Sequence, residues 1–203
     1  MIEFFYDLSS PWTYLAFRNI EGIAGETGAG IRWRPVLAGG VFNAVNKTIY
    51  VAREDAENPK VRHGIKILHD WARLSGLAMT FPSPHHPLKS VAPMRMCCVL
   101  EEDQAALSVF SGAAFDAYFR LGLNLDDTAV LVAIATQCGH DGEKLLHRSA
   151  EEQAKARLRA NTQELIDRGG YGSPTIFIGG TDMYFGNDQL PLVRRALERG
   201  VPT

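Results

Sequence analysis

Residues 2–16 read IEFFYDLSSPWTYLA, an apolar run followed at once by a Ser-Ser-Pro step and a second apolar pattern. Residues 2–6 are rich in aromatic and β-branched types, which is typical of a short buried strand. Residues 12–24 have apolar positions at helical spacing. Ser10 followed by Pro11 is a favoured N-cap and first helical position. This stretch therefore predicts a strand that leads directly into a helix.

The next segments extend this start to a β-α-β unit and then to helices. Residues 31–36 predict a second strand, which a right-handed crossover would place parallel to the first. Residues 41–59 have no clear pattern and are expected to be irregular. Residues 60–167 then contain one helical pattern after another and no convincing strand. The middle of the chain is therefore expected to be all-helical.

Strands return near the C-terminus. Residues 175–178 form a compact apolar run, and residues 181–185 follow it after Gly179-Gly180, which is a hairpin signal. A final helix is expected from Asn187. The C-terminal part therefore predicts a β-β-α unit.

Neither flanking unit can bury its strands alone, so both are expected to share one sheet. This order predicts an α/β protein with a thioredoxin-like fold and a large all-helical insertion. We expect a thioredoxin-like domain made of residues 1–37 and 169–203, and a helical insertion domain made of residues 38–168.

Composition excludes several classes of function. The chain has 203 residues, a net charge of −2 at pH 7 and a sequence pI near 6.3. Dedicated binders of nucleic acids or acidic membranes have basic surfaces. No apolar run approaches the roughly 20 residues that cross a bilayer, and the N-terminus lacks the pattern of a secretory signal. We therefore expect a cytoplasmic protein without nucleic-acid or membrane partners.

The cysteines also favour a reducing compartment. Cys97 and Cys98 are neighbours that rarely pair with each other, and Cys138 makes the number odd. No Cys-x-x-Cys motif and no Cys/His spacing typical of a metal site is present, so we expect no metal. The three cysteines are interpreted as small buried hydrophobic residues.

The first candidate for chemistry is the helix start at Ser10. The first turn of a helix has N–H groups without intrahelical partners, and its dipole is positive at that end. An anion is stabilised there, and the pKa of a thiol falls there. The simpler alternative is that Ser10 only caps the helix, which explains an isolated Ser-Pro pair equally well.

Two further candidates lie near the C-terminus. Pro174 stands at the start of an apolar strand, where it cannot donate to a central ladder, so the Ser173-Pro174 bond is either cis or the strand is an edge strand. Asn187 and Asp188 stand at another helix start, where capping and the helix dipole explain them. Asp188 alternatively binds the ammonium group of a ligand.

In combination, these motifs resemble the 2-hydroxychromene-2-carboxylate isomerases, relatives of the kappa-class glutathione transferases in the DsbA-like thioredoxin-fold group. The resemblance runs along almost the whole chain. Its N-terminal and central residues are Phe5-Tyr6-Asp7, Ser9 to Ala16, Trp33 to Leu37, Gly39 to Phe42, Lys60, Trp71-Ala72, Gly76, Phe81-Pro82, Ser90, Met94 and Arg95. Its C-terminal residues are Gly172 to Thr175, Gly179-Gly180, Phe185 to Asp188 and Leu190.

The resemblance implies a role for Ser10. Redox members of the fold group have a Cys-x-x-Cys pair where this chain has Ser10 and Thr13, so dithiol chemistry at this place is excluded. In the isomerase family the matching serine hydrogen-bonds the thiolate of bound glutathione. Ser10 is therefore the expected catalytic residue, and the nucleophile would be the glutathione sulfur.

The resemblance also implies the glutathione contacts. Pro174 would be cis, with the backbone N–H and C=O of Ser173 facing glutathione as an added strand would. Asn187 and Asp188 would hold its γ-glutamyl end. The expected cofactor-binding residues are Ser10, Lys47, Lys60, Ser173, Pro174, Phe185, Gly186, Asn187 and Asp188.

The function implied is glutathione-dependent isomerisation of 2-hydroxychromene-2-carboxylate-type aromatic acids, in the degradation of aromatic compounds, by a homodimer. One alternative is a kappa-like glutathione transferase that acts on a small electrophile. Another is a non-catalytic thioredoxin-fold module that binds glutathione or a peptide.

Overall fold

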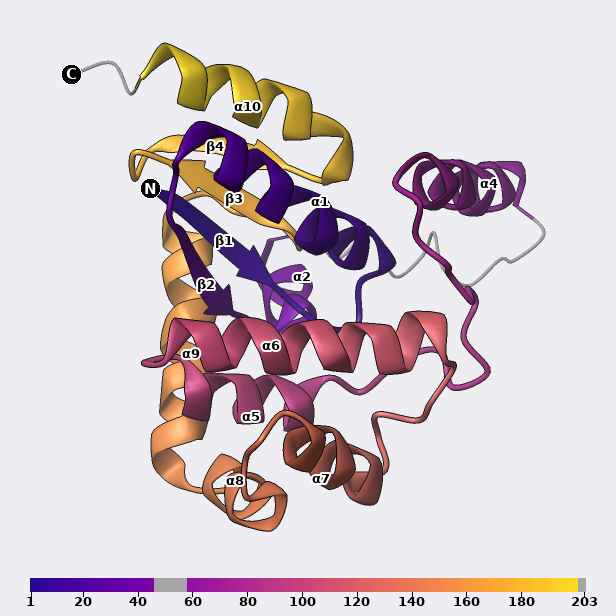
Figure 1. Cartoon of the computed structure of the whole chain (residues 1–203), viewed down its shortest axis with the longest axis vertical. Coiled ribbons are helices and arrows are strands. Elements are labelled where there is room, and N and C mark those ends of the chain that lie inside the picture. Colours follow the sequence, from indigo (N-terminus) through magenta and orange to yellow (C-terminus); the bar gives the residue numbers. More distant parts are fainter. Residues whose placement is uncertain (46–57, 201–203) are drawn as a thin grey trace.

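The computed structural model describes residues 1–45 and 58–200 and contains a four-stranded sheet in the order β2-β1-β3-β4 (Figure 1). The strands are β1 (Ile2–Tyr6), β2 (Ile31–Pro35), β3 (Thr175–Ile178) and β4 (Asp182–Phe185). β1 is parallel to β2 and antiparallel to β3, and β3 is antiparallel to β4. The expected β-α-β and β-β-α units therefore share one sheet.

The helices follow the expected order with a long helical insertion between β2 and β3. They are α1 (Pro11–Thr27), α2 (Ala38–Val45), α4 (Pro59–Leu74), α5 (Val91–Leu100), α6 (Gln104–Phe115), α7 (Thr128–Gln137), α8 (Gly142–Ser149), α9 (Glu152–Asp167) and α10 (Leu190–Arg199), with a π-helical turn η1 (Asp116–Arg120) and a 3₁₀ turn η2 (Asn187–Gln189). None of the helices in the described residues is long and apolar enough to cross a membrane.

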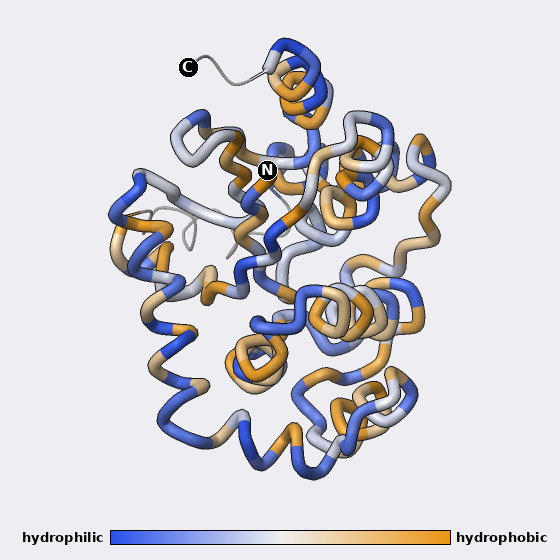
Figure 2. The backbone as a smooth tube through the Cα atoms, turned by 60° about the vertical axis from the view of Figure 1, so that its left-hand side comes forward, coloured by the Kyte–Doolittle hydropathy of each residue, from blue (hydrophilic) through white to orange (hydrophobic). Residues whose placement is uncertain are grey.

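Helices cover both faces of the sheet because side chains alternate along each strand. Phe4 joins the large core that contains Phe17 of α1, whereas its neighbour Phe5 packs with Val41 of α2 and Leu165 of α9. In Figure 1, α10 lies beside α1, and α5 to α8 form the lower part of the molecule. The tube of α10, next to the C mark in Figure 2, changes between blue and orange within a turn, as expected for a helix with one covered face.

The sequence analysis missed α2, whose second half falls in residues 41–59, which were expected to be irregular. The Ala38 N–H donates to Oδ2 of Asp7 at 2.7 Å, so a residue from the end of β1 stabilises the start of this helix. A Cβ on Gly40 would lie 3.2 Å from the methyl group of Thr162. The missing side chain therefore lets α2 approach α9 closely.

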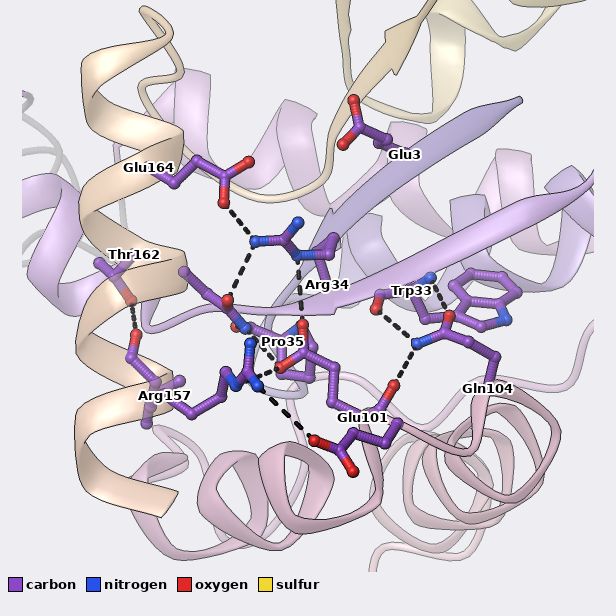
Figure 3. A network of polar contacts seen from close by, with 12 residues as sticks. Glu3, Trp33, Arg34, Pro35, Glu101, Gln104, Arg157, Thr162 and Glu164 are labelled. Carbon is purple, nitrogen blue, oxygen red and sulfur yellow. Dashed lines mark hydrogen bonds and ion pairs between the residues drawn. The ribbon is translucent and has the colours of Figure 1, made fainter. Parts of the chain in front are cut away.

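A buried polar network joins the insertion to β2 (Figure 3). Arg34, only 5% exposed, lies with Nε 3.2 Å from Glu101 and also contacts Glu164 on α9. Asn161 donates to Glu101 at 2.8 Å and to the Pro35 carbonyl at 3.0 Å. The network therefore links α9 and the end of α5 to one edge of the sheet.

Gln104 closes another part of that edge. Its side-chain oxygen accepts from the Trp33 N–H at 2.6 Å, and its amide nitrogen donates to the Trp33 carbonyl at 3.4 Å (Figure 3). An edge strand otherwise exposes these groups to other chains. The insertion therefore covers the β2 edge.

Candidate functional site

Ser10 is the N-cap of α1 and touches the loop before β3. Its Oγ accepts from the Thr13 N–H at 3.2 Å and donates to the Ser173 carbonyl at 3.2 Å. Two residues that are 163 positions apart in sequence are thus in direct contact. The antiparallel pairing of β1 with β3 places them there, since both lie just beyond the paired residues Phe5 and Thr175.

Little of the first turn of α1 is left without a partner. Pro11 has no N–H, the Thr13 N–H bonds to Ser10 Oγ, and the Tyr14 N–H donates to the Ser10 carbonyl at 3.1 Å. Within residues 1–45 and 58–200, the Trp12 N–H has no hydrogen-bond acceptor. The Trp12 N–H is therefore the group left at the positive end of this helix, beside a Ser10 hydroxyl whose proton is directed to Ser173.

The Ser173-Pro174 bond is cis, as expected, and so are the Phe81-Pro82 and His86-Pro87 bonds, which the sequence analysis did not anticipate. β3 is an inner strand, so the alternative of an edge strand does not apply. The backbone of Ser173 differs from the expectation in one respect. Its carbonyl already accepts the Ser10 hydroxyl, so this carbonyl is not simply open toward a ligand.

The side chain of Ser173 joins Thr13 to Asp7. The Ser173 hydroxyl shares a 2.9 Å hydrogen bond with the Thr13 hydroxyl, and it accepts the Asp7 N–H at 2.9 Å. All three residues are buried. Behind Ser10 there is therefore a packed hydroxyl cluster at the place where redox members of the fold group have their second cysteine.

Asp7 is a residue to which the sequence analysis assigned no role. It is completely buried, and burial raises the pKa of its carboxyl, while hydrogen bonds from Ser9, Ala38 and Ser90 oppose that rise. Its position directly after an apolar strand and before a Ser-Ser-Pro step was the available signal. A carboxylate there has to find its partners inside the protein, and the sequence did not show which they are.

Phe185 and Gly186 lie just before Asn187 and connect this segment to the Ser173-Pro174 loop. The Gly186 N–H donates to the Pro174 carbonyl at 3.1 Å. Gly186 has φ +91°, and a Cβ there would lie 2.7 Å from Oδ1 of Asp188. This position therefore requires glycine for two reasons. The ring of Phe185 packs against Tyr171 with centroids 4.5 Å apart.

Asn187 and Asp188 point in different directions. Asn187 is 1% exposed, and its Oδ1 accepts from Nδ2 of Asn19 at 2.9 Å, while the same Asn19 amide donates to Ser75 at 2.9 Å. Asp188 is exposed. The structure therefore leaves Asp188 available to a ligand, whereas the side chain of Asn187 ties the η2 turn to α1.

Of the two lysines expected to bind glutathione, the structure describes only Lys60. Lys60 is exposed in the first turn of α4, where Asn58 accepts its N–H at 2.9 Å. Lys47 lies outside the described residues.

The helix α4 packs on α1 through a small cluster of Leu15, Leu68 and Ala72. The insertion thus reaches the helix that carries Ser10, as the position of α4 beside α1 in Figure 1 also shows.

Two of the three cysteines are buried as expected, whereas Cys138 is only partly buried, so that part of the expectation was wrong. Cys97 and Cys98 are buried in the core, and burial raises the pKa of the Cys97 thiol to about 12 and that of Cys98 further. Within the described residues no group of three or more His, Cys, Asp or Glu side chains is arranged to hold a metal ion. Any sulfur that reacts at Ser10 has to arrive with a ligand.

Comparison with known proteins gives a consistent result. Residues 1–198 match the family model described as the DSBA-like thioredoxin domain. A 2-hydroxychromene-2-carboxylate isomerase of Pseudomonas putida is 24% identical over 200 residues, which cover 98% of this chain and 95% of that protein. Glutathione S-transferase kappa 1 of Caenorhabditis elegans is 23% identical over 223 residues, covering 99% of this chain and 92% of that protein. A solved 2-hydroxychromene-2-carboxylate isomerase superposes with a TM-score of 0.82 at 24% identity, covering 98% of this chain and 94% of that one.

Proposed function

The chain belongs to the family of DSBA-like thioredoxin domains, and from this membership and the geometry at Ser10 we propose that it is a glutathione-dependent isomerase of 2-hydroxychromene-2-carboxylate-type aromatic acids. The observation that supports the proposal is the Ser10 hydroxyl at the start of α1, in contact with the Ser173-Pro174 loop and without a cysteine beside it. The names of the relatives support the reaction class.

The residues around Ser10 fit a thiolate. A hydroxyl and the Trp12 N–H at a helix N-terminus are donors of the kind that stabilise sulfur anions. Bound glutathione would supply a sulfur nucleophile, and the Ser10 hydroxyl and the Trp12 N–H would hold its thiolate. Ser10 has a single hydroxyl proton. In the structure this proton is directed to the Ser173 carbonyl, and rotation about the Cβ–Oγ bond would redirect it to the sulfur while Oγ keeps the Thr13 N–H.

The remaining contacts follow from the same arrangement. We assign the ammonium group of glutathione to Asp188 and the glycyl carboxylate to Lys60, with Ser173, Pro174, Phe185 and Gly186 along its backbone. Asn187 would act through the turn that it holds. Lys47 and the homodimer remain expectations from the resemblance, and the cytoplasmic location remains an expectation from the sequence pattern.

Turnover tests the proposal. The protein is mixed with 2-hydroxychromene-2-carboxylate with and without glutathione, and the ultraviolet spectrum is followed. We expect isomerisation only with glutathione and a kcat/KM about tenfold or more lower in Ser10→Ala, since a hydrogen bond to a charged group is lost. Absence of isomerisation by the wild-type protein at any glutathione concentration overturns the proposal.

The second candidate is a glutathione transferase, which the kappa relative favours. Conjugation of glutathione to chlorodinitrobenzene without isomerisation would support it. Calorimetric binding of glutathione with neither reaction would indicate a binding module instead.

A further inference from the structure

Asp7 lies at the end of β1 and forms hydrogen bonds to four separate segments. Its Oδ1 accepts the Ser9 N–H at 2.9 Å, and its Oδ2 accepts the Ala38 N–H at 2.7 Å and the Ser90 hydroxyl at 3.0 Å. Its own N–H donates to the Ser173 hydroxyl at 2.9 Å. Its carbonyl accepts the Ser10 N–H at 3.3 Å. Two of these segments, the Ser9-Ser10 turn and the Ser173 loop, meet at the Ser10 hydroxyl.

The partners of the carboxylate are all neutral donors. Within residues 1–45 and 58–200, Asp7 forms no ion pair. Three donors converge on two oxygens, which only a carboxylate can satisfy, because an asparagine has one acceptor oxygen and an NH₂ group that would face a donor. The choice of an acid at a fully buried place without a counter-ion therefore has a geometric reason.

The hydrogen bonds of Asp7 determine where the Ser10 hydroxyl lies. The Asp7 carboxylate accepts the Ser9 N–H, which holds the Ser9-Ser10 turn. The Asp7 N–H donates to the Ser173 hydroxyl, and the carbonyl of the same Ser173 accepts the Ser10 hydroxyl. We propose that Asp7 is a positioning residue of the thiolate site, which keeps the Ser10 hydroxyl and the Ser173 loop in register. This role rests on the proposed function, since it concerns the same bound sulfur.

The test compares two ligands that differ only at the sulfur. Glutathione presents a thiolate to Ser10, whereas S-methylglutathione has the same backbone and no thiolate. Calorimetry gives both dissociation constants for the wild type, Asp7→Asn, Ser10→Ala and the double variant. We expect Asp7→Asn to lower the preference for glutathione over S-methylglutathione about tenfold, as Ser10→Ala does, and to have no further effect on this preference in the Ser10→Ala background.

Glu101→Gln is the matched control, because Glu101 is also a buried carboxylate but lies in the network at β2, away from Ser10. We expect it to lower thermal stability and to leave the ligand preference unchanged. If Asp7→Asn does not fold, Ser90→Ala removes one of the three hydrogen bonds to the carboxylate and should lower the preference less, in the same direction.

Three results would overturn the role of Asp7. Equal weakening of both ligands would show a merely structural contribution. A stronger preference for glutathione in Asp7→Asn would show that the charge acts by repelling the thiolate. A further loss in the Ser10→Ala background would show that Asp7 does not act through Ser10. Failure of the wild type to bind either ligand would instead overturn the proposed function, and the positioning role with it.

Discussion

The end of β1 and the end of α5 each bury a carboxylate, and burial raises the pKa of both Asp7 and Glu101. Their surroundings differ. Glu101 lies 3.2 Å from Arg34 and 3.8 Å from Arg157, and it accepts an amide hydrogen bond from Asn161 (Figure 3). In the part of the chain that the structure describes, Asp7 has no cationic partner and accepts from two backbone N–H groups and the Ser90 hydroxyl.

This difference separates a structural cluster from a cluster suited to binding. A buried ion pair cannot open without leaving an uncompensated charge, so the Arg34–Glu101 pair holds the insertion on the sheet permanently. A hydroxyl changes partner by rotation about one bond. The Ser10, Thr13 and Ser173 hydroxyls can therefore exchange an internal partner for a ligand while Asp7 keeps the backbone in place.

The largest effect is expected from a variant that breaks the charged cluster around Arg34 and Glu101. Arg34→Met removes a cation that contacts Glu101 and Glu164, and we expect the free energy of unfolding to fall by about 3–5 kcal/mol. Denaturant unfolding measures it. The double variant Arg34→Met/Glu101→Leu should recover part of the loss, because no buried charge is then left alone. A loss below about 1 kcal/mol in the single variant would contradict the structural role of this pair.

The next effect tests the hydroxyl cluster. Ser10→Ala should raise the pKa of the bound glutathione thiol toward its value in free glutathione, because a hydrogen bond worth about 1–3 kcal/mol to the thiolate is lost. Ultraviolet thiolate absorbance, titrated with and without protein, measures this pKa. Loss of the cap should also lower stability by about 0.5–2 kcal/mol, which a thermal melt records. The same thiol pKa in the wild-type and variant complexes would return Ser10 to a purely capping role.

A smaller effect concerns the exposed carboxylate. Asp188→Asn should raise the dissociation constant of glutathione about tenfold, which corresponds to about 1.4 kcal/mol of charge-assisted binding. Stability should change less, by about 0.3–1 kcal/mol, because Asp188 only complements the dipole of its short turn. Calorimetric titration and thermal melting check the two parts. Unchanged affinity would show that Asp188 serves the helix start alone.

The smallest effect concerns the raised pKa of the Asp7 carboxyl. A folded-state pKa above the unfolded value means that the folded protein binds more protons, so the contribution of Asp7 to stability falls as pH rises from near 3.8 through the raised pKa. Asp7→Asn removes this contribution. Its stability relative to wild type should therefore increase with pH across that window, as unfolding at several pH values would show. Parallel stability curves for the two proteins would contradict a raised pKa of Asp7.

Local patterns predicted much of the fold. The β1-to-α1 transition, the parallel strand β2 and the β3-β4 hairpin each follow from short stretches such as Ser10-Pro11 and Gly179-Gly180. The start of α2 did not follow, because Asp7 stabilises it from another segment. Within the helical patterns expected over residues 60–167, a π-helical turn, η1, was not expected; there Asp116 accepts a hydrogen bond from Tyr14 and forms an ion pair with Arg18 of α1. These partners are distant in sequence, so a pattern read from neighbouring residues cannot predict them.

For the candidate site, too, some features follow from the sequence and others only from the tertiary structure. The sequence by itself determined that a hydroxyl, and not a thiol, stands at the start of α1, that a proline precedes an apolar strand, and that Asn187 and Asp188 stand at a helix start. Only the tertiary structure decided that the Ser10 hydroxyl meets Ser173, that Asn187 points inward and that Asp7 has no counter-ion in the described chain. The physical reason is the range of the interactions. Helix starts and turns depend on neighbours within a few residues, whereas the satisfaction of a buried polar group depends on whichever segments the sheet register brings beside it.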